Sequence, residues 1–223
     1  MPLNVDDIRI FSHTISSSHL KNPDLGKETE GPGIGIYANK QTLKDLRSRF
    51  SYVFHETQIG GGKPKLRLEK AKQLDTVMPP EFKDVKVTPI PMLHGTVKTT
   101  GWLFTVVCRD KKEHSIAYLT DLSAIKDKNV QKIIDKGGII DHLVIDGLRV
   151  DPHATHFSFR QAMEVAEKIR PIHTWFIHIC HLNSHVQIEE YVKNNIADFP
   201  ELSKIVEAGG SVGPAWDGLV LSC

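Results

Sequence analysis

The sequence has few features that direct a protein to an oxidising compartment or a membrane. Only three of its 223 residues are cysteines, Cys108, Cys180 and Cys223, an odd number without C-x-x-C spacing, which argues against a disulfide framework. No stretch approaches the ~18 apolar residues of a membrane span. Residues 1–9 are polar and acidic, where a secretory signal is basic and then apolar. We therefore predict a soluble protein of a reducing compartment, the cytoplasm or the nucleus.

The chain also lacks an excess of charge of either sign. Its 28 basic and 27 acidic residues leave a formal net charge of +1, so no global field draws it to nucleic acid or an anionic membrane. The basic run Lys63–Lys72 could meet phosphates, but it has no interleaved aromatic residues and is typical of a solvated face. The three glycines Gly60–Gly62 precede Lys63, but the G-K-[ST] motif of a phosphate-binding loop is not completed. An ordinary loop is therefore favoured. We predict neither nucleic acid nor membranes as partners.

The chain is long enough for one substantial domain. Hydrophobic residues make up 40% of the 223, and dividing them between two independent domains would leave both small. The stretch His13–Gly35 is rich in Ser, Gly, Asn and Pro and has little periodicity. We predict a flexible lead segment over residues 1–33 and one domain over residues 34–223, beginning with a strand at Ile34.

Within that domain, helical and strand patterns alternate. Leu43, Leu46 and Phe50 at a spacing of three to four predict an amphipathic helix over Lys40–Phe50. Short β-branched or aromatic runs predict the strands Val85–Leu93, Gly101–Cys108, Ser115–Thr120 and His142–Asp146. Helices are predicted at Asn129–Lys136 before Gly137 and Gly138, from a Ser158/Gln161 capping box through Ile169, and from a Ser184/Gln187 capping box across Ile188–Val192. This mixture indicates layered α/β packing.

Three side chains of the kind that bind metals each follow an apolar run. His94 comes after VKVTPIPML, Asp121 after SIAYLT and His178 after TWFI. Backbone pairing in a sheet fixes where each Cβ points, so strands that end in ligands project imidazole and carboxylate into one cleft. Taken singly, each residue has a structural explanation, such as Asp121 capping the turn into Ser123. Together they predict a metal site.

The amino-acid sequence around these three residues strengthens this prediction. VTPIPMLHG, AYLTD, VIDGLR, HATHFSF, FIHICHLNSH and AWDGLVL resemble, in order, segments of the second half of the metallo-β-lactamase fold superfamily. The resemblance covers Tyr37 to Leu221 and is nearest to the cyclic phosphodiesterases of phosphonate breakdown. It implies an α/β (α+β) fold, the αββα sandwich. The family's H-x-H-x-D-H, which supplies four ligands, should precede Val5–Arg9, and we expect an incomplete sandwich through truncation or an alternative start.

The resemblance also implies the chemistry. In the family, two metal ions hold a bridging hydroxide that attacks phosphorus or a carbonyl carbon. His94 matches a ligand of the first ion, Asp121 the carboxylate that bridges both and His178 a ligand of the second, a set that suits Zn²⁺ or Mn²⁺. We expect at most one weakly held ion here. His156 matches the catalytic histidine that orients or protonates the leaving group beside a helix start, which favours phosphate, and Asp146 matches a carboxylate that acts through hydrogen bonds.

Other histidines could replace the absent ligands only if they point toward the site. His181 and His185 follow His178 closely along the chain. We predict that they line the exit of the site or face solvent. His13 and His19 lie in the lead segment, where recruiting them would cost ordering entropy.

The sequence leaves three functions open. The first is a metal-dependent hydrolase, phosphodiesterase-like, that acts on a small-molecule phosphate ester, either a cyclic phosphate or a phosphodiester. The second is an inactive remnant or binding module of the same fold. The third is an RNA-processing nuclease that contacts its substrate through Lys63–Lys72. Loss of the strands around the first motif would expose a sheet edge, which predicts pairing of copies into a homo-oligomer.

Overall fold

The computed structural model describes residues 33–54, 64–80, 82 and 84–222. The chain divides into two compact units, residues 1–72 and residues 73–223. The boundary falls inside the segment 34–223 that the sequence predicted as one domain. Residues 1–32 of the predicted lead segment, the triple glycine and Lys63 lie outside the described residues.

The first unit contains a small parallel sheet and two short helices. Strand β1 (Ile34–Ala38) pairs in parallel with β2 (Leu66–Lys70). Helix α2 (Lys40–Arg49) begins where the Asn39 side chain accepts a hydrogen bond from the Thr42 amide, and α3 (Ser51–Phe54) follows it. The amphipathic helix and the strand at Ile34 are therefore confirmed. Within the predicted basic run, Arg67 bonds to Glu69 and to the Gly33 carbonyl, so its guanidinium is engaged inside this unit.

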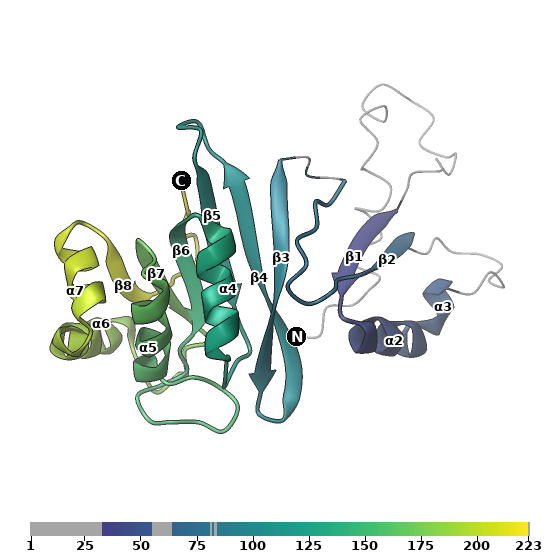
Figure 1. Ribbon diagram of the computed structural model, residues 1–223. Coiled ribbons are helices and arrows are strands. Elements are labelled where there is room, and N and C mark those ends of the chain that lie inside the picture. Colours follow the sequence, from purple (N-terminus) through teal and green to yellow (C-terminus); the bar gives the residue numbers. More distant parts are fainter. Residues whose placement is uncertain (1–32, 55–63, 81, 83, 223) are drawn as a thin grey trace, which may run out of the picture. The chain divides into compact units, whose positions relative to one another are not determined.

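The second unit is built on a six-stranded sheet with the order β3-β4-β5-β6-β7-β8 (Figure 1). The strands are β3 (Val85–His94), β4 (Val97–Val107), β5 (Glu113–Leu119), β6 (Ile139–Asp146), β7 (His173–Ile177) and β8 (Ser211–Pro214). Strands β3, β4 and β5 pair antiparallel, and β5 to β8 pair parallel. Strand β3 therefore runs in the same direction as β5 to β8, which places the carboxyl ends of all these strands at one edge of the sheet.

Helices of the second unit alternate with the parallel strands, which confirms the mixed α/β class. They are α4 (Asp127–Gly137), α5 (Phe159–Ile169), α6 (His185–Asn195), the 3₁₀ turn η3 (Ile196–Asp198) and α7 (Pro200–Glu207). Ser158 and Ser184 form the predicted capping boxes at the starts of α5 and α6. Helix α5 ends where Arg170 adopts a left-handed conformation, one residue before Pro171.

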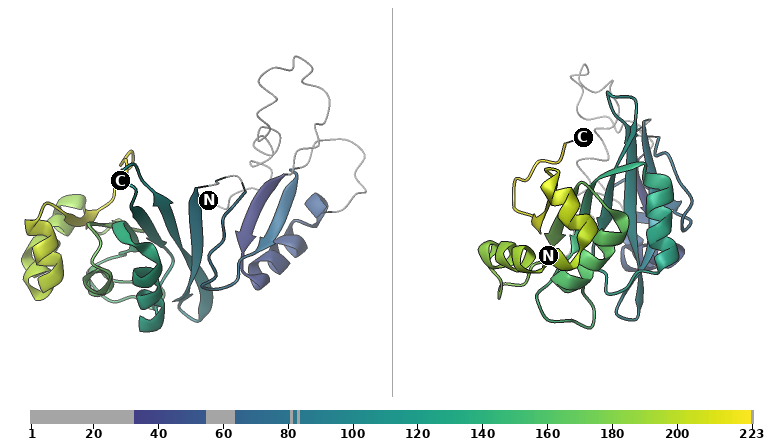
Figure 2. Two further views of the ribbon diagram at one scale, coloured as in Figure 1. Left: turned by 45° about the horizontal axis from the view of Figure 1, so that its top comes forward. Right: turned by 60° about the vertical axis from the view of Figure 1, so that its left-hand side comes forward.

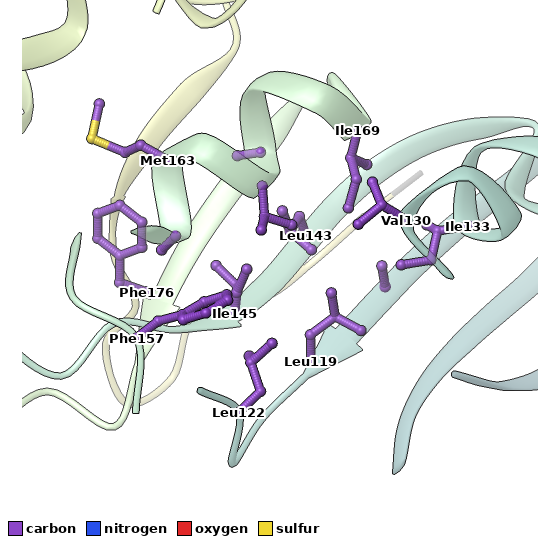
Figure 3. Close-up of a cluster of buried hydrophobic side chains, with 14 of the residues drawn as sticks. Leu119, Leu122, Val130, Ile133, Leu143, Ile145, Phe157, Met163, Ile169 and Phe176 are labelled. Carbon is purple, nitrogen blue, oxygen red and sulfur yellow. The ribbon is translucent and has the colours of Figure 1, made fainter. Parts of the chain in front are cut away.

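The hydrophobic core fills the space between the sheet and the helices that lie on one of its faces. Figures 1 and 2 show α4 and α5 side by side against the strands. In Figure 3, Leu119, Leu143 and Ile145 extend from the strands toward Met163 of α5 and Ile133 of α4. These side chains are all fully buried, and each contributes roughly 1.5–3 kcal/mol of transfer free energy. This packing fixes the strands whose ends carry the candidate ligands.

The opposite face of the sheet carries a group of stacked rings. The Trp175 indole N–H donates to His142 Nδ1 at 3.1 Å, and His142 Nε2 lies 3.0 Å from the Ser222 carbonyl oxygen. The rings of His142 and His173 stack with centroids 5.1 Å apart. Burial lowers the pKa of His173, and the proximity of His142 lowers it further. Both nitrogens of His142 are engaged, so this histidine offers no lone pair to a metal.

Both edges of the sheet have features that discourage pairing with another strand. Along β3, Val77 bridges to Val87, the Leu74 amide donates to the Pro89 carbonyl, and proline also occupies position 91. The other edge strand, β8, has only 4 residues and ends in a proline. Assembly of copies through a sheet edge stays a prediction.

The cysteines depart from the sequence-based expectation. Cys108, directly after β4, is disulfide-bonded, whereas Cys180 is a free thiol. The odd count and the lack of C-x-x-C spacing gave no sign of this bond, because a disulfide requires proximity in the fold rather than along the chain. Among the described residues, no helix has the length and apolar character needed to cross a membrane.

Candidate metal centre

The carboxyl edge of the sheet gathers the candidate ligands. His94 is the last residue of β3, Asp121 follows β5 by two residues, Asp146 is the last residue of β6, and His178 follows β7 directly. His156 lies in the loop that connects β6 to α5. Because β3, β5, β6 and β7 run in the same direction, residues distant in the sequence arrive at a common edge. We call these side chains the edge cluster.

The edge cluster contains two overlapping groups of potential ligands. Ligand atoms of His94, Asp121 and His156 lie within 4.8 Å of one another, and so do those of Asp146, His156 and His178. Nε2 of His94 is 3.3 Å from Nε2 of His156. Nδ1 of His178 is 3.6 Å from an Asp121 carboxylate oxygen. The predicted residues His94, Asp121 and His178 thus come together, with His156 among them.

Asp146 is the buried carboxylate of the edge cluster. Its side chain is 0% exposed. Oδ2 is 2.7 Å from His156 Nδ1 and accepts a hydrogen bond from the Leu122 amide at 3.0 Å. Oδ1 is buried without a hydrogen-bond partner among the described residues, although His178 Nδ1 lies 3.5 Å away. A buried carboxylate of this kind requires positively polarised neighbours. Asp146 thus bonds to an imidazole of the edge cluster, and its role in supporting a metal site stays a prediction.

His178 is the more accessible imidazole beside Asp146. Its side chain is 37% exposed, compared with 19% for His156. Nε2 of His178 lies 3.2 Å from the Thr120 hydroxyl. The adjacent Asp146 carboxylate raises the pKa of His178, burial opposes this change, and the negative charge of Asp121 adds to the increase.

Two residues of the edge cluster have a backbone conformation that is rare for non-glycine residues. Asp121 has φ 53° and His178 has φ 60°. Left-handed conformations at such residues cost on the order of 1–3 kcal/mol each and are concentrated at functional sites. The neighbouring Gly95 also has a positive φ of 60°, and its amide donates to the Ser123 hydroxyl at 2.8 Å. The turns after β5 and β7 therefore orient the side chains of Asp121 and His178 through a strained backbone conformation.

The start of α5 is less available to a phosphate than the sequence predicted. The Ser158 amide donates to the Gln161 side chain, the Gln161 amide to the Ser158 hydroxyl, and the Phe159 amide to the Arg149 carbonyl. These amides already have protein acceptors. The helix start thus fixes the loop that carries His156, and it offers an anion few free donors.

Other histidines take no part in the ligand groups among the described residues. His181 and His185 are exposed, and His13 and His19 lie outside the described residues. His153, which the sequence did not single out, lies beside the cluster with its ring centroid 5.6 Å from that of His156. Thr120 and Ser123 were also missed, since a hydroxyl near a strand end has no distinctive sequence signal.

The donors of the edge cluster fit a divalent ion. Imidazole nitrogens and carboxylate oxygens are ligands that Zn²⁺ accepts, and Mn²⁺ accepts a similar set. The buried Asp146 oxygen without a hydrogen-bond partner is the kind of unsatisfied group that marks functional sites. The hydrogen bond between Asp146 and His156 has the form of the carboxylate–histidine pairs that orient metal-bound imidazoles.

Comparison with known proteins identifies the family. The model of the beta-lactamase superfamily domain matches residues 17–179, a span that contains every residue of the edge cluster. The chain belongs to the metallo-β-lactamase fold superfamily. The resemblance predicted from the sequence is confirmed by this match and by the solved structures that share the fold.

Relatives differ in how much of their length the chain spans. A diphosphatase of the PhnP family has 26% sequence identity and a TM-score of 0.65, with 99% of this chain and 66% of that chain covered. The metallo-β-lactamase fold protein YhfI from Bacillus subtilis has 15% identity and a TM-score of 0.54, which shows the fold alone. An octanoyltransferase from Porphyromonas gingivalis is 27% identical over 149 residues, which are 66% of this chain and 27% of that protein.

Proposed function

We propose that the chain is a metal-dependent hydrolase of a small-molecule phosphate ester, either a phosphodiester or a cyclic phosphate. The convergence of imidazoles and carboxylates at the carboxyl edge of the sheet carries this proposal. The likeness to a PhnP-family diphosphatase supports phosphorus chemistry over other hydrolytic reactions. The proposed ion is Zn²⁺ or Mn²⁺, because both accept mixed imidazole and carboxylate ligands.

The residues of the edge cluster supply complementary roles. An ion bound there would polarise a phosphoryl oxygen and lower the pKa of its water from ~15.7 toward 7. Asp146 orients the His156 ring through its Oδ2, and the adjacent His178 approaches Oδ1 of the same carboxylate. One of these two imidazoles serves as a ligand, and the other is available to carry a proton to the leaving oxygen.

Hydrolysis of model phosphate esters tests the proposal. The metal-stripped chain, reconstituted with Zn²⁺ or Mn²⁺, should hydrolyse bis(4-nitrophenyl) phosphate or a 2′,3′-cyclic nucleotide. His94→Ala and Asp121→Ala should remove this activity, whereas His185→Ala at the exposed start of α6 should retain it. A fully metal-loaded chain that turns over neither substrate would refute the proposed function.

A binding module of the same fold is the competing function, and metal dependence separates the two. An ion that binds only the folded state stabilises it by RT ln(1 + [L]/Kd), which is about 2.7 kcal/mol at a concentration 100 times Kd. The hydrolase should therefore melt at a higher temperature with Zn²⁺, and His94→Ala should abolish the increase. For a binding module that holds no metal, Zn²⁺ should leave the melting temperature of both the wild type and His94→Ala unchanged.

A further inference from the structure

The loop that connects β6 to α5 carries an imidazole that does not belong to the edge cluster (Figure 1). His153 lies in this loop, and its ring centroid is 5.6 Å from that of His156, with the two ring planes tilted by 32°. His153 is exposed. Among the described residues, it is the one imidazole outside the edge cluster whose ring contacts a ring within it. A molecule that reaches the cluster can therefore also reach His153.

The proton of the His153 ring is placed by Thr155. The Thr155 amide donates to Nδ1 of His153 at 3.4 Å, and the Thr155 hydroxyl lies 3.2 Å from the same nitrogen. Because an amide N–H can only donate, Nδ1 carries the lone pair, and the ring proton lies on Nε2. Within the part of the chain that the structure describes, Nε2 has no hydrogen-bond partner. His153 thus holds a free N–H donor beside the edge cluster.

Contacts within the loop hold this donor in place. On one side of His153, the Arg149 guanidinium donates through Nη2 to the Pro152 carbonyl oxygen at 3.3 Å. On the other side, a Cβ added to Gly95 would lie 3.1 Å from Thr155 Cγ2, so Thr155 packs against the turn between β3 and β4. A donor that is positioned in advance loses less conformational entropy when it binds a ligand.

A phosphate ester at the edge cluster needs a donor of this kind. A phosphodiester is an anion, and the cluster already contains the carboxylates of Asp121 and Asp146. The amides at the start of α5 have protein acceptors, so they offer the anion no free N–H. Since an N–H···O bond is about 2.9 Å long, two donors roughly 6 Å apart can share one phosphoryl oxygen. The spacing of the His153 and His156 rings is comparable.

We propose that His153 is a substrate-binding residue whose Nε2–H donates to a non-bridging oxygen of an anionic phosphate ester. This inference rests on the proposed function, and it specifies the charge of the substrate. Hydrogen bonds to ionised acceptors are about twice as strong as those between neutral groups. The site therefore favours phosphodiesters and cyclic phosphates over neutral phosphotriesters and carboxylic esters. A contact that is equally strong in the bound substrate and in the transition state lowers KM and leaves kcat unchanged.

The kinetics of the metal-loaded full chain test this contact, with bis(4-nitrophenyl) phosphate as the anionic substrate. His153→Ala should raise KM about 10-fold, because a hydrogen bond to a charged acceptor is lost, and kcat should stay within about threefold. His153→Gln has an amide N–H that can take the place of Nε2–H. This variant should return KM to within about threefold of the wild type.

Binding of inorganic phosphate tests the same contact without turnover. In calorimetric titrations of the Mn²⁺-loaded full chain, His153→Ala should weaken phosphate binding about 10-fold, and His153→Gln should restore most of the affinity. Melting temperatures equal to that of the wild type establish that each variant is folded.

A matched control and a positioning variant complete the series. His185→Ala removes another exposed imidazole, at the start of α6, and should change neither KM nor phosphate affinity. Thr155→Val keeps the backbone amide and the shape of the side chain but removes the hydroxyl that lies near Nδ1 of His153. It should raise KM by only about two- to threefold, because the amide still fixes the ring proton on Nε2.

The outcomes separate this inference from the proposed function. If the wild type hydrolyses the substrate and His153→Ala changes neither KM nor phosphate affinity, the assignment is overturned and the function stands. A fall in kcat at constant KM also overturns it, because His153 would then act in the chemical step. Phosphate binding that depends on His153, in a chain without turnover, supports the contact and refutes the function. A metal-loaded wild type that neither binds phosphate nor hydrolyses the ester refutes both.

Discussion

At the scale of single residues, a position at the end of a strand was the most informative sequence feature. His94, Asp121 and His178 follow apolar runs, and parallel strand directions bring them together. The sequence could not show that His156 Nε2 faces His94, because that contact depends on a loop and on the buried Asp146. The left-handed backbone at Asp121 and His178 was equally unpredictable, since it is a local conformation that tertiary contacts impose.

A titratable group far from the edge cluster links stability to pH. Nδ1 of His114 lies 2.8 Å from an Asp141 oxygen, and Nε2 lies 3.0 Å from Asp110. Hydrogen bonds to Asp110 and Asp141 raise the pKa of His114 above 6.5. The resulting stability is fully present below about pH 6.5, the unfolded value, and is lost as pH rises through the folded pKa. We expect His114→Gln to flatten the fall in melting temperature above pH 6.5.

Thermal unfolding between pH 6 and pH 9 checks this expectation, with His181→Gln as the control at an exposed position. The control should follow the wild-type profile. Parallel profiles for the wild type and His114→Gln would show that the raised pKa of His114 makes no contribution to folding.

At the scale of elements, the sequence predicted what capping chemistry and periodicity specify. The capping boxes at Ser158 and Ser184 start helices where predicted. Strand β8, with the sequence SVGP, is too short and too rich in glycine and proline to show a strand pattern. Helix α7 begins at Pro200, a residue typical of a first helical position, but it has no side-chain cap to strengthen that signal. These elements exist because the sheet and the core provide partners for them.

Gly138 ends α4 in a conformation that depends on glycine. It has φ 61° and ψ −122°, and an added Cβ would lie 2.8 Å from the Glu113 carbonyl oxygen. We expect Gly138→Ala to lower the free energy of unfolding by at least ~1–3 kcal/mol, because both the backbone and the contact resist a side chain.

Urea unfolding measures this loss. Gly213 in β8 is the matched control, since an added Cβ there meets nothing within 4 Å. Gly213→Ala should therefore change stability by less than ~1 kcal/mol. Equal losses for the two variants would contradict the conformational argument.

At the scale of the whole molecule, the fold class and family could be predicted, whereas the division of the chain could not. Composition was consistent with one domain, yet the chain divides into two compact units between Lys72 and Gln73. No Gly-, Pro- or Ser-rich linker marks this boundary in the sequence LEKAKQLD. The contact density that defines the units is a property of the folded chain.

The second unit contains the edge cluster and the hydrophobic cluster of the core. We therefore expect a fragment of residues 73–223 to unfold cooperatively and to bind Zn²⁺ with an affinity within about threefold of the full chain. Calorimetric titration of both proteins measures this, with His94→Ala in the fragment as the control for binding elsewhere. A folded fragment without zinc affinity would show that the site requires residues 1–72.

The position of a bound ion is the most direct test of the proposed metal-dependent function. Anomalous diffraction at the zinc edge, from crystals of the full chain grown with Zn²⁺, locates the ion independently of any assumption about its ligands. The proposed function predicts a peak at the carboxyl edge of the sheet, in contact with ligand atoms of the edge cluster. No peak at this edge would contradict it.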